Sequence, residues 1–200
     1  MTARSAVSPV RVVAGDIFFP ALERYRLHVI APRVVGVVAS VGGWLFDRAM
    51  AGWEVTVLLA STGEDPLPIH ILGGEVVALE TGPQREWYRT SPDALAVAAD
   101  LCSRDNRIRE KVQLALDRGR SEVALWGQSW PDELDSIAQV ETVEYRLSVA
   151  ARAFKARALA AAAWPVAPAP AIEVIRTNRT AIVSTRTTFP PRTPSSQRSP

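Results

Sequence analysis

The chain of 200 residues is poor in the side chains that bind metals through sulfur or imidazole, with one cysteine and two histidines. A lone cysteine, Cys102, excludes an internal disulfide and a zinc site built from several cysteines. His28 and His70 lie far apart in the sequence, and neither has a carboxylate at helical spacing to complete a ligand set. The sequence therefore predicts no metal site.

Long apolar runs are also missing. No stretch of eighteen consecutive apolar residues occurs, and the first thirty residues lack the basic and apolar regions of an export signal. We therefore expect neither a membrane span nor export, and the single cysteine agrees with a reducing cytoplasm. With 48% apolar and 22% charged residues, the composition is that of a globular chain and excludes disorder throughout.

Lysine is rare, since only two of the 23 basic residues are lysines, and this bias is typical of codon usage in a GC-rich genome. Residues 165–200 carry five arginines and one acid, a net charge of +4, which leaves −2 for residues 1–164. The body of the protein thus lacks the basic surface of a dedicated nucleic-acid domain, and no nucleic-acid partner is expected.

Proline content divides the chain, because seven of the fifteen prolines lie after Trp164. We expect a flexible N-terminus over 1–9, a single α/β domain over 10–164 and a disordered tail over 165–200. Residues 172–175 and 181–183 could pair as a weak hairpin, but two isolated strands are marginal in water, so disorder is expected there as well.

Between these ends, strand patterns alternate with helix patterns. Gly42 and Gly43 lie inside the first expected helix, so that helix should either break there or pack closely against a neighbour. The expected strands cover residues 27–31, 54–60, 75–80 and 122–127, and the expected helical segments cover 34–49, 66–72, 91–118 with an interruption near 105–106, and about 131–163.

This alternation predicts an α/β fold, because repeated βα units form a parallel sheet with helices on both faces. We expect a small Rossmann-like three-layer sandwich with a mostly parallel sheet of about four strands, a long C-terminal helix and a disordered tail. Ligands of such folds bind beyond the carboxyl ends of the strands. The corresponding loops are residues 32–34, 61–65, 80–83 and 127–133.

Four short motifs occur within residues 31–64: A-P at 31–32, G-G-W-L at 42–45, A-G-W-E-V-T-V at 51–57 and T-G-E at 62–64. Their spacing resembles the amino-terminal βαβ unit of the PIG-L type N-acetylglucosaminyl deacetylases. That family reads A-P-H-P-D-D-E, G-G-x-L, A-G-H-x-V-T-V and T-D-G-E. The resemblance implies a βαβ fold, and in the family this unit carries the catalytic zinc.

The catalytic residues of the family are replaced here. The zinc-binding histidine falls on Arg33, the two aspartates on Val35 and Gly36, the following glutamate on Val37, and Thr62 replaces the aspartate of T-D-G-E. Arginine, valine and glycine side chains cannot hold zinc, so the resemblance implies no deacetylase activity. It reflects either a degenerate relative or a βαβ geometry common to many folds. The wider chain is similar to proteins of GC-rich bacteria, which implies no mechanism.

The loop after the second expected strand is polar and contains glycine, so Ser61, Thr62, Glu64 and Asp65 are candidates for binding a phosphate or a sugar. Neither G-x-G-x-x-G nor a P-loop is present, and an ordinary turn is the alternative. Glu80 ends the next strand, where a ribose-binding acid lies in dinucleotide folds.

The loop after the last expected strand contains Gln128, Ser129 and Trp130. Its strand-to-helix context is that of a nucleophile elbow, but Pro131 does not suit the tight turn. Ser129 is more simply the cap of the following helix. Trp130 is placed to meet a ligand or a partner.

Taken together, these features predict a cytoplasmic domain, non-catalytic or catalytically degenerate, that binds a small ligand or a protein partner at its strand-end loops. An alternative is a nucleotide- or sugar-dependent enzyme that uses Glu64, Asp65, Glu80, Asp132 or Glu133, with Mg²⁺ as a possible cofactor. A third reading concerns the last helix: 33 residues would span about 50 Å, long enough to serve as a homo-oligomer contact.

Overall fold

A computed structural model describes residues 24–79, 91–127, 140–164 and 169–178. Within this part, the chain forms a seven-stranded sheet of order β3-β2-β1-β4-β5-β7-β6. The strands are β1 (Arg26–Ala31), β2 (Glu54–Leu59), β3 (Glu75–Ala78), β4 (Ala94–Ala98), β5 (Glu122–Trp126), β6 (Glu141–Arg146) and β7 (Ile172–Thr177). The helices are α1 (Val34–Met50), α2 (Leu67–Ile71), α4 (Ala99–Arg104), α5 (Asn106–Arg118) and α7 (Val149–Ala161).

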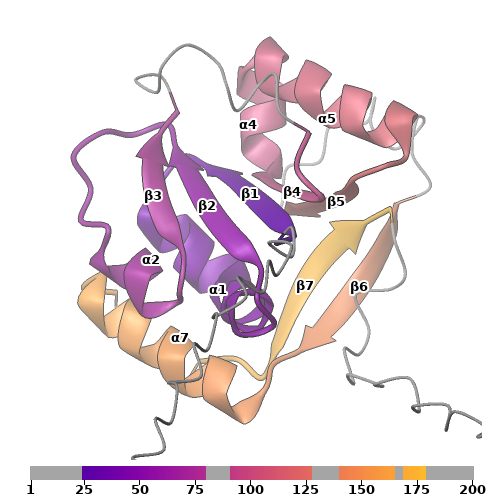
Figure 1. Ribbon diagram of the computed structural model, residues 1–200. Coiled ribbons are helices and arrows are strands. Elements are labelled where there is room, and N and C mark those ends of the chain that lie inside the picture. The colour runs from indigo at the N-terminus through magenta and orange to yellow at the C-terminus, as the bar shows by residue number, and fades with distance from the viewer. Residues whose placement is uncertain (1–23, 80–90, 128–139, 165–168, 179–200) are drawn as a thin grey trace, which may run out of the picture.

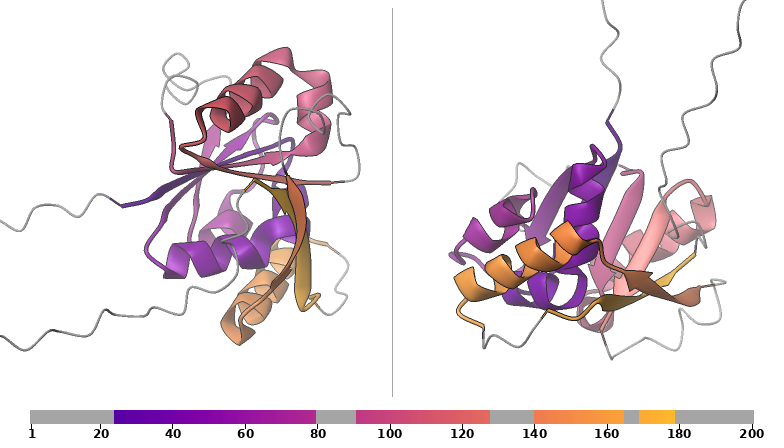
Figure 2. Two further views of the ribbon diagram at one scale, coloured as in Figure 1. Left: turned by 90° about the vertical axis from the view of Figure 1, so that its right-hand side faces the viewer. Right: turned by 90° about the horizontal axis from the view of Figure 1, so that it is seen from below.

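The sheet is the middle of three layers. Strands β1 to β5 are mutually parallel, whereas β7 runs antiparallel to β5 and β6 antiparallel to β7. Helices α1, α2 and α7 lie on one face and α4 and α5 on the other (Figures 1 and 2). The expected three-layer α/β fold with a mostly parallel sheet is therefore confirmed. No described helix is long and apolar enough to cross a membrane.

Burial follows from this layering. Every residue of β4 and of β5 is buried, as expected for strands covered on both faces. Helix α1 contributes the apolar stripe that contains Val37, Val41 and Trp44, all fully buried against the sheet and α7.

The strand count differs from the expected four, in part because the sequence predicts a helical segment over 91–118, where Ala94–Ala98 forms strand β4. Its sequence, A-L-A-V-A, contains no polar residue that could set either a helical or a strand period, so a buried strand and a buried helix look alike. The expected interruption near residue 105 is confirmed, since Asp105 separates α4 from α5 and its side chain accepts a hydrogen bond from the Arg107 N–H.

The expected long C-terminal helix is wrong where the structure describes it. Glu141–Arg146 forms strand β6, and α7 begins only after Ser148, whose hydroxyl caps it by accepting from the Ala151 N–H. With 13 residues, α7 is about 20 Å long. The described residues therefore contain no helix of about 50 Å, the feature from which a homo-oligomer contact was expected; residues 131–139 lie outside the described residues.

The expected boundary at residue 165 also needs correction, because Ile172–Thr177 is a full member of the sheet. Strand β7 pairs with β5 on one side and β6 on the other, so it is not the isolated hairpin considered from the sequence. Alternate residues Glu173, Ile175 and Thr177 are buried. Residues 1–23 and 179–200, which include the expected flexible ends and the strand at 181–183, lie outside the described residues.

The two glycines within α1 mark a close contact, and the helix runs through them without a break. A Cβ atom added to Gly43 would lie 2.4 Å from Leu147 Cδ1. Beside this contact, Lys155 of α7 and Glu173 of β7 form an ion pair of 2.6 Å with side chains 0% and 1% exposed. Glu173 also accepts from the N–H groups of Gly43 and Trp44, both at 2.8 Å.

Candidate functional site

The strand order reverses between β1 and β4, because the chain builds β2 and β3 on one side of β1 and then β4 and β5 on the other. In open parallel sheets, this switch point at the carboxyl edge is where ligands bind. Residue Arg33, at the start of α1, follows β1 directly and lies at this point. The loop after β2 is held beside it by the Ser61 N–H, which donates to the Pro32 carbonyl at 3.2 Å.

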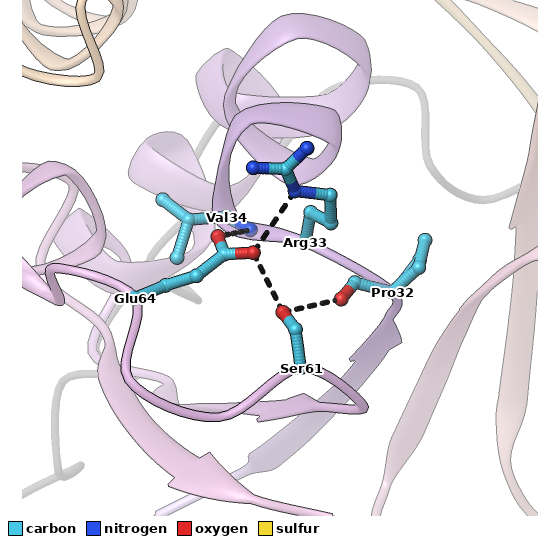
Figure 3. Close-up of polar contacts among 5 residues, drawn as sticks. All are labelled: Pro32, Arg33, Val34, Ser61 and Glu64. Atoms are coloured by element: carbon cyan, nitrogen blue, oxygen red, sulfur yellow. Dashed lines mark hydrogen bonds and ion pairs between the residues drawn. The ribbon is translucent and has the colours of Figure 1, made fainter.

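Glu64 is the centre of a compact hydrogen-bond network at this edge (Figure 3). Its carboxylate accepts from the Val34 N–H at 2.7 Å, from Arg33 Nε at 3.0 Å and from the Ser61 hydroxyl at 2.6 Å. The Ser61 hydroxyl also lies 2.8 Å from the Pro32 carbonyl oxygen, so its one proton is shared between two acceptors. Glu64 thereby ties the loop after β2 to the start of α1.

This network caps α1 from outside the helix. Arg33 occupies the N-cap position without a capping side-chain bond, and the first turn contains no acid. An N-terminus with free N–H groups and a positive dipole end favours a nearby carboxylate, and Glu64 supplies it. Burial alone would raise the pKa of Glu64, but hydrogen bonds from Ser61, the Val34 N–H and Arg33, together with the Arg33 charge, lower it overall.

Replacing Glu64 by glutamine is expected to lower the free energy of unfolding by about 1 kcal/mol at pH 7, the typical size of a lost cap. The pKa of Glu64 is lowered by folding, so its contribution is present at neutral pH and is lost as the pH falls through the folded value. Urea unfolding at pH 7 and at about pH 3 should therefore show the two proteins converging in acid. Glu54→Gln, an exposed carboxylate at the opposite edge, is the matched control, and an equal cost for both variants at pH 7 would contradict the capping role.

The other predicted site residues are placed differently. Thr62 is exposed beside the network, and Asp65 Oδ1 accepts from the Leu67 N–H at 2.9 Å, which starts α2. The structure therefore brings Ser61 and Glu64 together and directs Asp65 toward a turn. Glu80, Gln128, Ser129 and Trp130 lie outside the described residues, as do Asp132 and Glu133.

The sequence did not predict Arg33 as a binding residue, although its loop, residues 32–34, was expected at the ligand-binding edge of the sheet. Its side chain is 69% exposed, and among the described residues only Nε has a hydrogen-bond partner. The guanidinium lies above the Glu64 carboxylate, and a dashed line joins the two side chains at Nε (Figure 3). The pairing could have been predicted from the sequence, because Arg33 and Glu64 have opposite charges and follow two neighbouring parallel strands, β1 and β2.

The described residues contain no group of three or more histidine, cysteine or acidic side chains placed to hold a metal ion. His28 lies half-buried in β1, and burial, followed by the charges of Arg26 and Lys111, lowers its pKa to about 4. Cys102 is buried, and burial raises the pKa of its thiol to about 12. Neither group lies in the network around Glu64.

No family model and no curated protein sequence matches the chain. Among solved structures, a deacetylase of teicoplanin biosynthesis in complex with teicoplanin is 12% identical, with 76% of this chain and 97% of that chain covered and a TM-score of 0.51. The 4-carboxy-2-hydroxymuconate hydratase of Pseudomonas putida is 12% identical, with coverages of 77% and 95% and a TM-score of 0.47. The diacetylchitobiose deacetylase of Pyrococcus horikoshii is 14% identical, with coverages of 57% and 67% and a TM-score of 0.35. At these identities the likeness concerns the fold alone, and the chain shares the fold of the PIG-L type deacetylases, as the motifs over residues 31–64 predict.

Proposed function

We propose that the chain is a catalytically degenerate domain of the deacetylase fold that binds a small ligand at the carboxyl edge of its sheet without a metal ion. The observation that carries this proposal is the ion pair between Arg33 and Glu64 at the switch point of the sheet. A cytoplasmic location remains part of the proposal.

The residues at this edge do not fit the zinc ion of the related deacetylases. The positions that match the family's metal ligands are Arg33, Val35 and Gly36, and a guanidinium offers only donors while valine and glycine offer no side-chain ligand. Among the described residues, the acid that contacts this segment is Glu64, which already accepts three hydrogen bonds and pairs with Arg33. We therefore derive no zinc-dependent step for this chain.

Arg33 is the side chain at this edge that can bind an anionic group of a ligand. A guanidinium presents its N–H groups in a planar fork that matches a carboxylate or a phosphate with two parallel hydrogen bonds. Glu64 accepts a hydrogen bond from Nε and leaves both terminal nitrogens without a partner among the described residues, and the charge of Arg33 offsets part of the negative charge of the acidic loop. We infer a ligand that carries a carboxylate or phosphate group, with the exposed Thr62 at the rim of the site.

A thermal-shift screen of nucleotides, sugar phosphates and amino sugars tests this function, because a ligand at 100 times its dissociation constant adds about 2.7 kcal/mol of stability. Arg33→Gln should weaken the binding of any ligand found by about tenfold or more. The matched control is Arg104→Gln, an exposed arginine on α4 paired with Asp100 at 3.7 Å, which should leave binding unchanged.

The same screen with and without Mg²⁺ distinguishes metal-free ligand binding from the alternative, a nucleotide- or sugar-dependent enzyme that uses Mg²⁺. Stabilisation that requires Mg²⁺ and is lost in Asp65→Asn would favour an enzyme that uses the acidic loop. Binding that is equal in the Arg33→Gln variant and the wild type would contradict the role proposed for Arg33. A failure of all compounds to stabilise the protein would favour a protein partner at this edge.

A further inference from the structure

Helix α7 lies on the outside of the molecule. It packs against α1 and α2 and lies farther from the sheet than α1 does (Figure 2). The inward face of α7 carries its buried residues, Ala151, Lys155, Ala158 and Leu159. The opposite face is open to solvent along the helix, over about 20 Å. Nothing in the resemblance or in the proposed function uses this outer face.

Three large apolar side chains are exposed on α7 and at its end. Val149 in the first turn is 84% exposed, Phe154 is 41% exposed, and Trp164, just after the helix, is 47% exposed. The ring of Phe154 stacks on the buried Phe46 with the ring centroids 4.5 Å apart, so its position is fixed. Single exposed apolar residues are ordinary, but three on one short helix and its end indicate an interaction surface.

The exposed charges on α7 are all positive. Arg152 and Arg157 are exposed, and in the described part of the chain neither side chain forms a hydrogen bond or an ion pair. Lys155 is the other cation of the helix, and it points inward to Glu173. The helix contains no acid that could offset the two arginines on its outer face.

The charge of the whole chain is divided between its two parts along the sequence. Residues 146–200 hold nine basic residues and one acid, a net charge of +8, and since the chain carries +2, residues 1–145 carry −6. The one acid of the C-terminal part is Glu173, which is buried and paired with Lys155. A partner for the outer face of α7 should therefore be anionic, and it should also accept apolar side chains.

We propose that the outer face of α7 binds the surface of an anionic lipid bilayer. Helices that lie in a membrane interface combine inserted apolar and aromatic side chains with cations that meet the lipid phosphates. A second copy of the chain fits less well, because two α7 helices would bring unpaired arginines together. A nucleic acid also fits less well, because the aliphatic side chain of Val149 offers neither a stacking surface nor a hydrogen bond.

Co-sedimentation of the full chain with vesicles tests this surface, using phosphatidylcholine alone or mixed with an equal amount of phosphatidylglycerol. We expect binding to the anionic vesicles only, and sodium chloride should weaken it by screening the charges. The double variant Arg152→Gln with Arg157→Gln should weaken binding by about tenfold or more, and Val149→Ser by about threefold or more. The matched control, Arg104→Gln with Arg118→Gln, removes the same charge from the other side of the sheet and should change binding by less than about twofold.

Quenching by brominated lipids shows which side of the molecule meets the bilayer. Anionic vesicles with brominated acyl chains should quench part of the tryptophan fluorescence, and Trp164→Phe should lose most of that part. The proposal is overturned if anionic vesicles are not bound, if neutral vesicles are bound equally, if the control pair weakens binding as much as the α7 pair, or if Trp164→Phe leaves the quenching unchanged.

The same variants distinguish this surface from other sites. Binding of duplex DNA through Arg152 and Arg157, with no binding of vesicles, would assign the face to nucleic acid and would also overturn the proposal. Arg33→Gln should leave vesicle binding unchanged, so a failure at α7 is distinguishable from a failure of the proposed function.

Discussion

Replacing Lys155 by methionine is expected to lower the free energy of unfolding by about 3–5 kcal/mol, the cost of leaving one partner of a buried ion pair uncompensated. Lys155 Nζ donates to Glu173 at 2.6 Å and to the Ala39 carbonyl at 2.7 Å, and both side chains are completely enclosed. Methionine retains most of the apolar stem, so the loss reports the charge and its hydrogen bonds. The pair joins α1, α7 and β7, and its removal should therefore weaken all three elements together.

The pH dependence of the stability lost in Lys155→Met shows whether the unpaired charge of Glu173 causes the loss. Burial raises the pKa of Glu173 even against the opposing effects of Lys155 and the two backbone N–H groups. Without Lys155 the pKa should rise further, so the carboxyl gains its proton at higher pH. The penalty in Lys155→Met should then be largest at neutral pH and shrink as the pH falls.

Urea unfolding followed by tryptophan fluorescence measures both effects. Arg157→Met, an exposed position on the same helix, is the matched control. The double variant Lys155→Met with Glu173→Leu should cost less than the sum of the single variants, because no lone charge remains. A cost below about 1 kcal/mol for Lys155→Met would contradict the structural role of the pair.

Gly43→Ala is expected to destabilise the protein by about 1–3 kcal/mol, the usual range for overpacking a core. The new methyl group would clash with Leu147 Cδ1 and would lie 2.5 Å from Leu147 Cδ2, which is closer than carbon atoms approach in folded proteins. Leu147 is buried, with 5% exposure, so its side chain has little room to move aside. The hydrogen bond from the Gly43 N–H to Glu173 further fixes the backbone at this position.

Gly36→Ala in the same helix provides a control of opposite sign. A Cβ atom at Gly36 meets nothing within 4 Å, so alanine should stabilise α1 by about 0.5–1 kcal/mol through its better helix propensity. Thermal unfolding tests both expectations: Tm should fall in Gly43→Ala and rise in Gly36→Ala. Equal shifts of Tm in the same direction would show that packing against Leu147 does not determine the need for glycine at position 43.

The elements that the sequence predicted correctly have strong local patterns. The β-branched residues of β1, β2 and β3, the short apolar run of β5 and the apolar stripe of α1 predict these elements without any knowledge of their neighbours. Strand β4 does not, because its five apolar residues fit a buried strand and a buried helix equally well.

Strands β6 and β7 were missed for a different reason. Each depends on partners distant in sequence: β7 is stabilised between β5 and β6, and Glu173 is buried only because Lys155 and the backbone of α1 meet it. A glutamate in a proline-rich segment gives no local indication of such a partner. At the candidate site, the sequence identified the loop at 61–65, but it did not show that Glu64 would pair with Arg33 and cap α1.

The zinc content of the purified protein tests most directly the claim that the carboxyl edge works without a metal. After equilibration with excess zinc and gel filtration, we expect elemental analysis to find far less than one zinc per chain, and we expect Tm to be unchanged by zinc or EDTA. One zinc per chain that stabilises the fold and is lost in Glu64→Gln or His70→Ala would contradict the account, because it would show that the network around Glu64 opens to bind a metal ion.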